Sequence, residues 1–166
     1  MTVVSNTSPL GYLIAVGRPN LIQKIFGHIL IPRGVEEELV HPSAPAATRQ
    51  WIAEKPEWLE VQVLSHDPEV ELLRQLDQGE CEAIQLAMDI QADFLLIDER
   101  RGRKIATDRG ITVVGILGIL IESCRRGYVQ NPREILEQLR KVGFRVSRRL
   151  AIEFEEQIAA LNIPDS

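Results

Sequence analysis

Short apolar runs alternate along the chain with segments whose apolar residues recur at helical spacing. The apolar runs predict strands at residues 3–4, 28–31, 59–64, 94–97 and 111–114. The helical spacing predicts helices at residues 8–16, 21–26, 34–40, 46–54, 67–76, 79–91, 100–109, 117–126, 132–141 and 147–161. Because strands that alternate with helices are typical of α/β proteins, we expect a three-layer α/β/α fold with a mainly parallel sheet.

The chain length of 166 residues suits one domain over residues 1–166. Only helices are predicted from about residue 116 onward, so residues 116–166 are expected to form a C-terminal helical extension. No repeat, low-complexity tract or long linker separates a second domain.

The composition is that of an ordinary globular protein, with 45% hydrophobic and 26% charged residues. A net charge of −5 argues against a protein that coats nucleic acid through bulk charge, but it leaves open a nuclease with a local site. Cys81 and Cys124 have no metal-binding spacing and are expected to be free thiols in a reducing cytosol. With no secretion signal and no apolar stretch near the ~18 residues of a membrane helix, we expect a cytoplasmic protein that does not bind membranes.

Two polar residues stand directly after predicted strands. Asn6 follows the first strand, and Asp98 follows the buried run FLLI at residues 94–97. In parallel sheets the functional crevice lies beyond the carboxyl ends of the strands, so both are candidate site residues. Each also has a structural explanation, because Asn6 suits a turn and Asp98 could cap the helix that follows.

Glu80 is expected on the core-facing side of its helix, because Ala83, Ile84 and Ala87 lie three, four and seven positions beyond it. Glu82 is expected on the opposite, solvated face with Gln85 and Asp89. An acid in a first helical turn also simply complements the helix dipole, and that explanation stays open for Glu80.

Glu38 ends the acidic run of EEEL at residues 36–39. Such a run is usually a solvated helix face, but Glu38 adjoins the side that Val35 and Leu39 mark as buried. It is therefore a candidate site residue with an ordinary alternative.

Four basic residues begin directly after Asp98 and Glu99. Beside an acidic pocket, such side chains could bind phosphates without reading sequence. They could equally form a solvated helix face that pairs with Asp98, Glu99 and Asp108. The four residues are Arg100, Arg101, Arg103 and Lys104.

In order and spacing these positions resemble the PIN domain (PilT N-terminal) family, the fold of VapC-type toxin ribonucleases. The matching segments are Asn6-Thr7-Ser8, Glu38-Leu39, Glu80 with Ala83 and Ala87, and Asp98. The resemblance spans roughly residues 3–114 and is closest to a poorly characterised branch with the same SNTSPL opening, GE-x-EAI helix and IDE-x-x-GR-x-A segment. The 18-residue step from Glu80 to Asp98 fits the family and favours Glu80 over Glu82.

The resemblance implies metal-dependent hydrolysis of an RNA phosphodiester. It makes Glu38, Glu80 and Asp98 the catalytic residues and, with Asn6, the ligands of Mg²⁺ or Mn²⁺. Ser8 is expected to hydrogen-bond a ligand carboxylate, and the four basic residues after Glu99 to contact the RNA. At the family level, a small antitoxin protein and a homodimer are the implied partners.

Two departures from the family pattern weaken the expected metal site, and the first of them, Asn6, favours an alternative function. Asn6 replaces the family's first Asp, which keeps an oxygen ligand but removes a negative charge, and Leu96 replaces a frequent Thr or Ser. The alternative function is a weakened or inactive PIN-like module retained for binding a partner. A doubly wound nucleotide-binding protein is disfavoured because no glycine-rich phosphate loop follows a strand.

Overall fold

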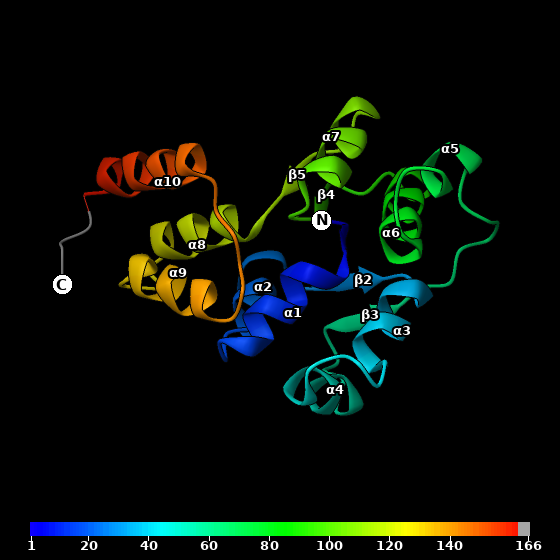
Figure 1. Cartoon of the computed structure of the whole chain (residues 1–166), viewed down its shortest axis with the longest axis horizontal. Coiled ribbons are helices and arrows are strands. Elements are labelled where there is room, and N and C mark those ends of the chain that lie inside the picture. The colour runs from blue at the N-terminus through cyan, green and yellow to red at the C-terminus, as the bar shows by residue number, and fades with distance from the viewer. Residues whose placement is uncertain (163–166) are drawn as a thin grey trace.

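The computed structural model describes residues 1–162 (Figure 1). Its strands are β1 (Val3–Ser5), β2 (Ile29–Ile31), β3 (Leu59–Val61), β4 (Phe94–Leu96) and β5 (Val113–Val114). Its helices are α1 (Thr7–Ala15), α2 (Asn20–Phe26), α3 (Arg33–Val40), α4 (Ala46–Ala53), α5 (Val70–Leu73), α6 (Gln78–Asp89), α7 (Arg100–Asp108), α8 (Ile116–Arg125), α9 (Pro132–Lys141) and α10 (Arg148–Ala160).

The strands form one parallel sheet in the order β3-β2-β1-β4-β5. Helices cover the sheet, which confirms the predicted three-layer α/β/α fold. The chain lays down β1, β2 and β3 in one direction and then returns to place β4 on the other side of β1. The order therefore reverses between β1 and β4, and this switch point is where parallel α/β sheets form a crevice.

One hydrophobic cluster joins the sheet to the helices on both sides of it. Val4, Ile29 and Leu95 of the central strands are fully buried, because a parallel sheet is covered on both faces. Phe154 and Ile158 of α10 belong to the same cluster, whereas Leu150 of that helix is exposed. Figure 1 shows α8, α9 and α10 grouped on the side of the molecule away from α3 and α6.

Residues 67–76 were predicted as one helix, but only the short α5 forms there. Pro68 precedes it, and the residue before a proline is disfavoured in helical conformation. The Glu69 N–H is also used by the Gln85 side chain at 2.9 Å, so the backbone before α5 is held by a side chain rather than by a helical turn.

The predicted strand at residues 59–64 likewise ends early, at Val61, with one further backbone bond from Gln62 to Ile31. Residues 63–68 then leave the sheet as a loop at its carboxyl edge. Within residues 1–162, no helix has the length and apolar character needed to cross a membrane.

Candidate functional site

Asn6 and Asp98 follow β1 and β4, which are hydrogen-bonded neighbours, so both residues lie at the carboxyl edge of the sheet at the switch point. The Asn6 backbone N–H donates to the Leu96 carbonyl at 2.9 Å, which fixes Asn6 directly beyond the paired strands. The Asn6 side chain is only 3% exposed, and its Oδ1 is buried without a hydrogen-bond partner among the described residues. A buried acceptor left unpaired costs free energy and is a reason to look for a ligand there.

Asp98 points toward the first turn of α8. Its Oδ1 accepts the Ile116 N–H at 2.9 Å, so Asp98 caps α8. The sequence had offered a cap of α7, the helix that directly follows Asp98, and that cap does not form. Its Oδ2 is buried without a hydrogen-bond partner among residues 1–162. Burial is the main cause that raises the Asp98 pKa from 3.8 to about 6, and the Ile116 N–H and the Arg103 charge oppose the rise.

Arg103 lies beside Asp98 through a close approach at the start of α8. Its Nη1 donates to the Ile97 carbonyl at 2.8 Å. A Cβ on Gly115 would lie 2.8 Å from both that nitrogen and the Asp98 Oδ1, so a side chain here would displace at least one of them. The structure thus places one of the four predicted phosphate-binding residues against the protein's own backbone and carboxylate.

Glu38 projects from α3 toward the start of α6, where it meets Thr7 and Gly79. The Thr7 hydroxyl donates to the Glu38 Oε2 at 2.5 Å, and the Gly79 backbone N–H also stabilises the charged carboxylate. Burial outweighs both contacts and raises the Glu38 pKa above its usual range. Thr7, and not the predicted Ser8, therefore contacts a site carboxylate; no hydrogen bond links the Ser8 side chain to any residue in the described part of the chain.

Glu80 is 7% exposed, which confirms the prediction that it faces the core. Its backbone N–H is capped by the Asp77 side chain at 2.9 Å, while its carboxylate faces Gly102 of α7. Burial raises the Glu80 pKa to about 7, and the nearby carboxylates of Asp77, Glu99 and Glu38 add to the rise. Arg101 opposes it, so Arg101 lies within electrostatic reach of Glu80.

The helical-wheel prediction for the opposite face of α6 is wrong for Gln85. Gln85 is 3% exposed because it accepts from the Glu69 N–H and donates to Asp89 at 2.9 Å. Glu82 is partly buried, and its contacts are to Gly34 and Gln78 rather than to solvent alone.

The predicted site residues thus form two halves. Asn6 and Asp98 share the β1–β4 switch point, while Glu38 and Glu80 lie within electrostatic reach of each other at the α3–α6 contact. Glu99 raises the pKa of both Glu80 and Asp98, so it lies within electrostatic reach of both halves, although the sequence did not single it out. Across residues 1–162, no three His, Cys, Asp or Glu side chains are close enough together to hold one metal ion.

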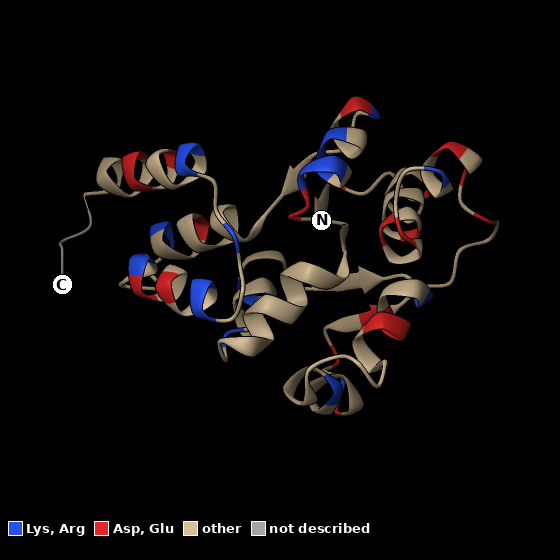
Figure 2. Ribbon diagram, viewed as in Figure 1, with Lys and Arg blue, Asp and Glu red and all other residues tan. Residues whose placement is uncertain are grey.

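The remaining basic candidates differ in their surroundings. Lys104 pairs with Asp108 at 3.0 Å on the exposed side of α7. This pairing agrees with the alternative in which the basic residues form a solvated helix face. Arg100 is exposed. Figure 2 shows the basic residues gathered on the first turns of α7, above the acidic residues that follow β4. Of the four, Arg101 and Arg103 are the ones that act on the site carboxylates.

A hollow of about 380 Å³ lies along the carboxyl edge of the sheet, beyond β2 and β3. Its lining consists of Arg33, residues 63–68, Gln78 and Glu82. It adjoins the start of α6 and therefore the Glu38–Glu80 half of the site.

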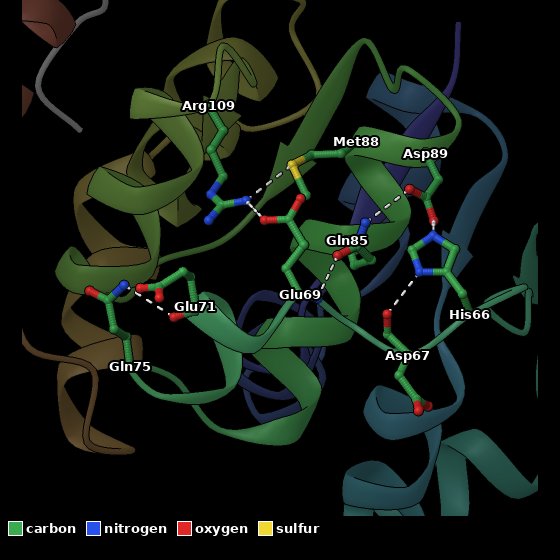
Figure 3. A network of polar contacts seen from close by, with 9 residues as sticks. All are labelled: His66, Asp67, Glu69, Glu71, Gln75, Gln85, Met88, Asp89 and Arg109. Carbon is green, nitrogen blue, oxygen red and sulfur yellow. Dashed lines mark hydrogen bonds and ion pairs between the residues drawn. The ribbon is translucent and has the colours of Figure 1, made fainter.

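A polar network holds the loop that forms one wall of this hollow (Figure 3). His66 contacts Asp89 at 2.9 Å and the Asp67 carbonyl at 2.8 Å, and both contacts raise the His66 pKa. Glu69 pairs with Arg109, which also contacts Met88 at 3.6 Å. These contacts tie the loop to α6 and to the end of α7.

A family model described as a PIN domain, DUF3368, matches residues 2–159. A solved PilT N-terminus domain protein from the hyperthermophilic archaeon Sulfolobus solfataricus P2 superposes with a TM-score of 0.56 at 20% identity, covering 74% of this chain and 93% of that one. At that identity the likeness shows the fold alone. No curated protein matches the chain.

Proposed function

Because the chain belongs to the DUF3368 family of PIN domains, we propose that it is a divalent-metal-dependent endoribonuclease of the PIN type. The observation that carries the proposal is the pair of buried, unpartnered oxygens, Asn6 Oδ1 and Asp98 Oδ2, beyond two adjacent strands. Hard divalent cations take oxygen ligands of these two kinds. The donor set therefore fits Mg²⁺ or Mn²⁺.

The residues that would hold the ion are Asn6 and Asp98, with Glu80 and Glu38 from the other half of the site. The raised pKa values of the three carboxyls fit such a role, because a bound cation offsets the cost of burying their negative charge. When bound, the ion supplies polarisation of a phosphoryl oxygen and a lowered pKa of a water molecule.

The chain's own groups would orient the site and contact the RNA. Thr7 fixes the Glu38 carboxylate, and the Ile116 N–H fixes one oxygen of Asp98 so that the other faces the site. Arg101 is exposed and lies near Glu80, so it is placed to contact a phosphate. The hollow beyond β2 and β3 would give room to the RNA next to the cleaved bond.

We also propose the toxin role, with a small antitoxin that covers the pocket, a homodimer and a cytoplasmic location. Two buried free thiols, Cys81 and Cys124, fit a reducing compartment. Sequencing the open reading frames next to this gene would test the toxin role, because a toxin gene is expected to lie beside the gene of its antitoxin.

The second candidate is a PIN-like binding module without catalysis. Two observations favour it: Asn6 supplies no charge, and no three acids gather around one point in residues 1–162. The proposed nuclease avoids this objection only if ion binding draws the two halves of the site together.

A cleavage assay separates the two candidates. End-labelled single-stranded RNA is incubated with the protein in MnCl₂ and in EDTA. The nuclease proposal expects cleavage only with Mn²⁺, its loss in Glu38→Ala and Asp98→Asn, and its retention in Lys104→Ala. No cleavage at any Mn²⁺ concentration, or cleavage that survives Asp98→Asn, would leave the binding module as the better account.

A further inference from the structure

Two glutamates and two glycines join α3 and α6 by reciprocal contacts, which we call the Glu–Gly clasp (Glu38, Gly79, Glu82 and Gly34). Glu38 of α3 lies against Gly79 of α6, and Glu82 of α6 lies against Gly34 of α3. Since α3 residues 34 and 38 meet α6 residues 82 and 79, the helices run antiparallel along this contact.

Both contacts need the absence of a side chain. A Cβ on Gly34 would come within 2.5 Å of the Glu82 Oε2, and a Cβ on Gly79 would overlap with the Glu38 carboxylate. Glycine thus lets each carboxylate approach the backbone of the other helix.

Each glycine lies in the first turn of its helix, where backbone N–H groups have no acceptor within the helix. The Gly34 N–H donates to the Glu82 Oε1 at 3.2 Å, and the Gly79 N–H stabilises the Glu38 carboxylate. Pro32, the N-cap residue of α3, has no side chain that can accept a hydrogen bond from the first turn. Glu82 of α6 therefore provides the capping acceptor for α3. Gln78 holds Glu82 in place through a 2.7 Å bond from its Nε2.

We propose that Glu82 is a positioning residue of the metal site: it fixes α3 against α6 and so sets where the Glu38 carboxylate lies relative to Glu80. This inference rests on the proposed metal-dependent function. The Glu82 oxygens accept from the Gly34 N–H and from the Gln78 Nε2, so Glu82 holds the first turn of α3, the helix that carries Glu38. Glu82 is therefore placed to act through Glu38, which lies within electrostatic reach of Glu80.

The variants Glu82→Ala and Glu82→Gln test the assignment by Mn²⁺ titration calorimetry. Glu82→Ala should weaken Mn²⁺ binding by about 10-fold, a usual cost of losing an outer-shell partner. Glu82→Gln should bind within about 2-fold of the wild type, since its amide oxygen still accepts the Gly34 N–H. Equal losses in both variants would make Glu82 a direct ligand, and unchanged affinity in Glu82→Ala would make it merely structural; either result overturns the proposal.

A second measurement does not depend on metal. The Glu38 carboxylate lies against Gly79 and stabilises its backbone N–H, so hydrogen exchange of the Gly79 amide by NMR responds to a displacement of Glu38. Exchange should accelerate several-fold in Glu82→Ala and stay unchanged in Glu82→Gln. In a Glu38→Ala background, Glu82→Ala should have no further effect. Unchanged exchange in Glu82→Ala would refute the clasp even if the wild type binds Mn²⁺.

Glycine substitutions provide the matched control. Gly34→Ala should weaken Mn²⁺ binding as Glu82→Ala does, because its Cβ displaces the Glu82 carboxylate. Gly11→Ala places the same methyl group in α1 with nothing within 4 Å, so it should leave Mn²⁺ affinity and stability undiminished. Equal Mn²⁺ affinities of the two variants would contradict the inference. If the wild type binds no Mn²⁺ but Gly79 exchange responds as described, the proposed function fails and the clasp stands.

Discussion

Replacing Glu80 by Gln should stabilise the metal-free protein at pH 8 while weakening its binding of Mn²⁺. Glu80 is 7% exposed, and its pKa is raised from 4.5 to about 7, mainly by burial. Its folded-state pKa thus lies above the unfolded value, so the folded state holds the proton more tightly. Stability should therefore fall as the pH rises from about 4.5 to about 7, and the loss is complete above that window.

The magnitude follows from the two pKa values. The difference between about 7 and 4.5 corresponds to about 3 kcal/mol of lost stability at pH 8, at about 1.4 kcal/mol per pKa unit. Gln removes the charge but still buries a polar amide, so a gain of about 1–3 kcal/mol is expected. For a domain of this size the gain raises the unfolding temperature by roughly 2–10 °C.

Thermal and urea unfolding in EDTA, at pH 4 and pH 8, measure this effect. Glu80→Gln should match the wild type at pH 4, where Glu80 is protonated, and exceed it at pH 8. Added Mn²⁺ should stabilise the wild type and not the variant. A variant no more stable than the wild type at pH 8, or a stability difference that is the same at both pH values, would show that Glu80 carries no buried charge at pH 8.

Three further substitutions test other parts of the site. Asn6→Asp should bind Mn²⁺ about 10-fold more tightly by calorimetry. It should also lower the unfolding temperature of the metal-free protein, since it adds a buried negative charge at the site of Asp98. Tighter Mn²⁺ binding with an unchanged unfolding temperature would show that the new charge is not buried. Asp98→Asn should keep its fold by circular dichroism, because its oxygen still accepts the Ile116 N–H, yet lose Mn²⁺ binding; retained binding would exclude Asp98 as a ligand. Arg101→Ala should weaken RNA binding several-fold in a filter-binding assay, whereas Lys104→Ala, which removes a side chain paired with Asp108, should not; equal effects would show that only net charge matters.

Patterns that depend on one element were predictable from the sequence. Alternating strands and helices gave the parallel sheet, and the positions of Asn6 and Asp98 after β1 and β4 follow from it. The core-facing direction of Glu80 was predictable too, because helical spacing alone places it beside Ala83 and Ala87.

Features that depend on contacts between elements were not predictable. Gln85 is buried, and its amide oxygen accepts the Glu69 N–H of a loop distant in sequence; the same bond, with Pro68, delays the start of α5. Asp98 caps α8 because β4 and β5 are neighbours, which brings residue 116 to it. The contacts of Glu82 with Gly34 and of Glu38 with Gly79 join two helices, so the residue spacing within either helix does not predict them.

The proposed function requires one ion to bind the unpartnered oxygens of Asn6 and Asp98. Anomalous scattering from crystals grown with Mn²⁺ tests it directly. We expect a manganese peak within about 2.5 Å of the Asn6 Oδ1 and the Asp98 Oδ2, with Glu80 drawn toward it. The absence of any peak there at saturating Mn²⁺, or a peak bound by other residues, would contradict it.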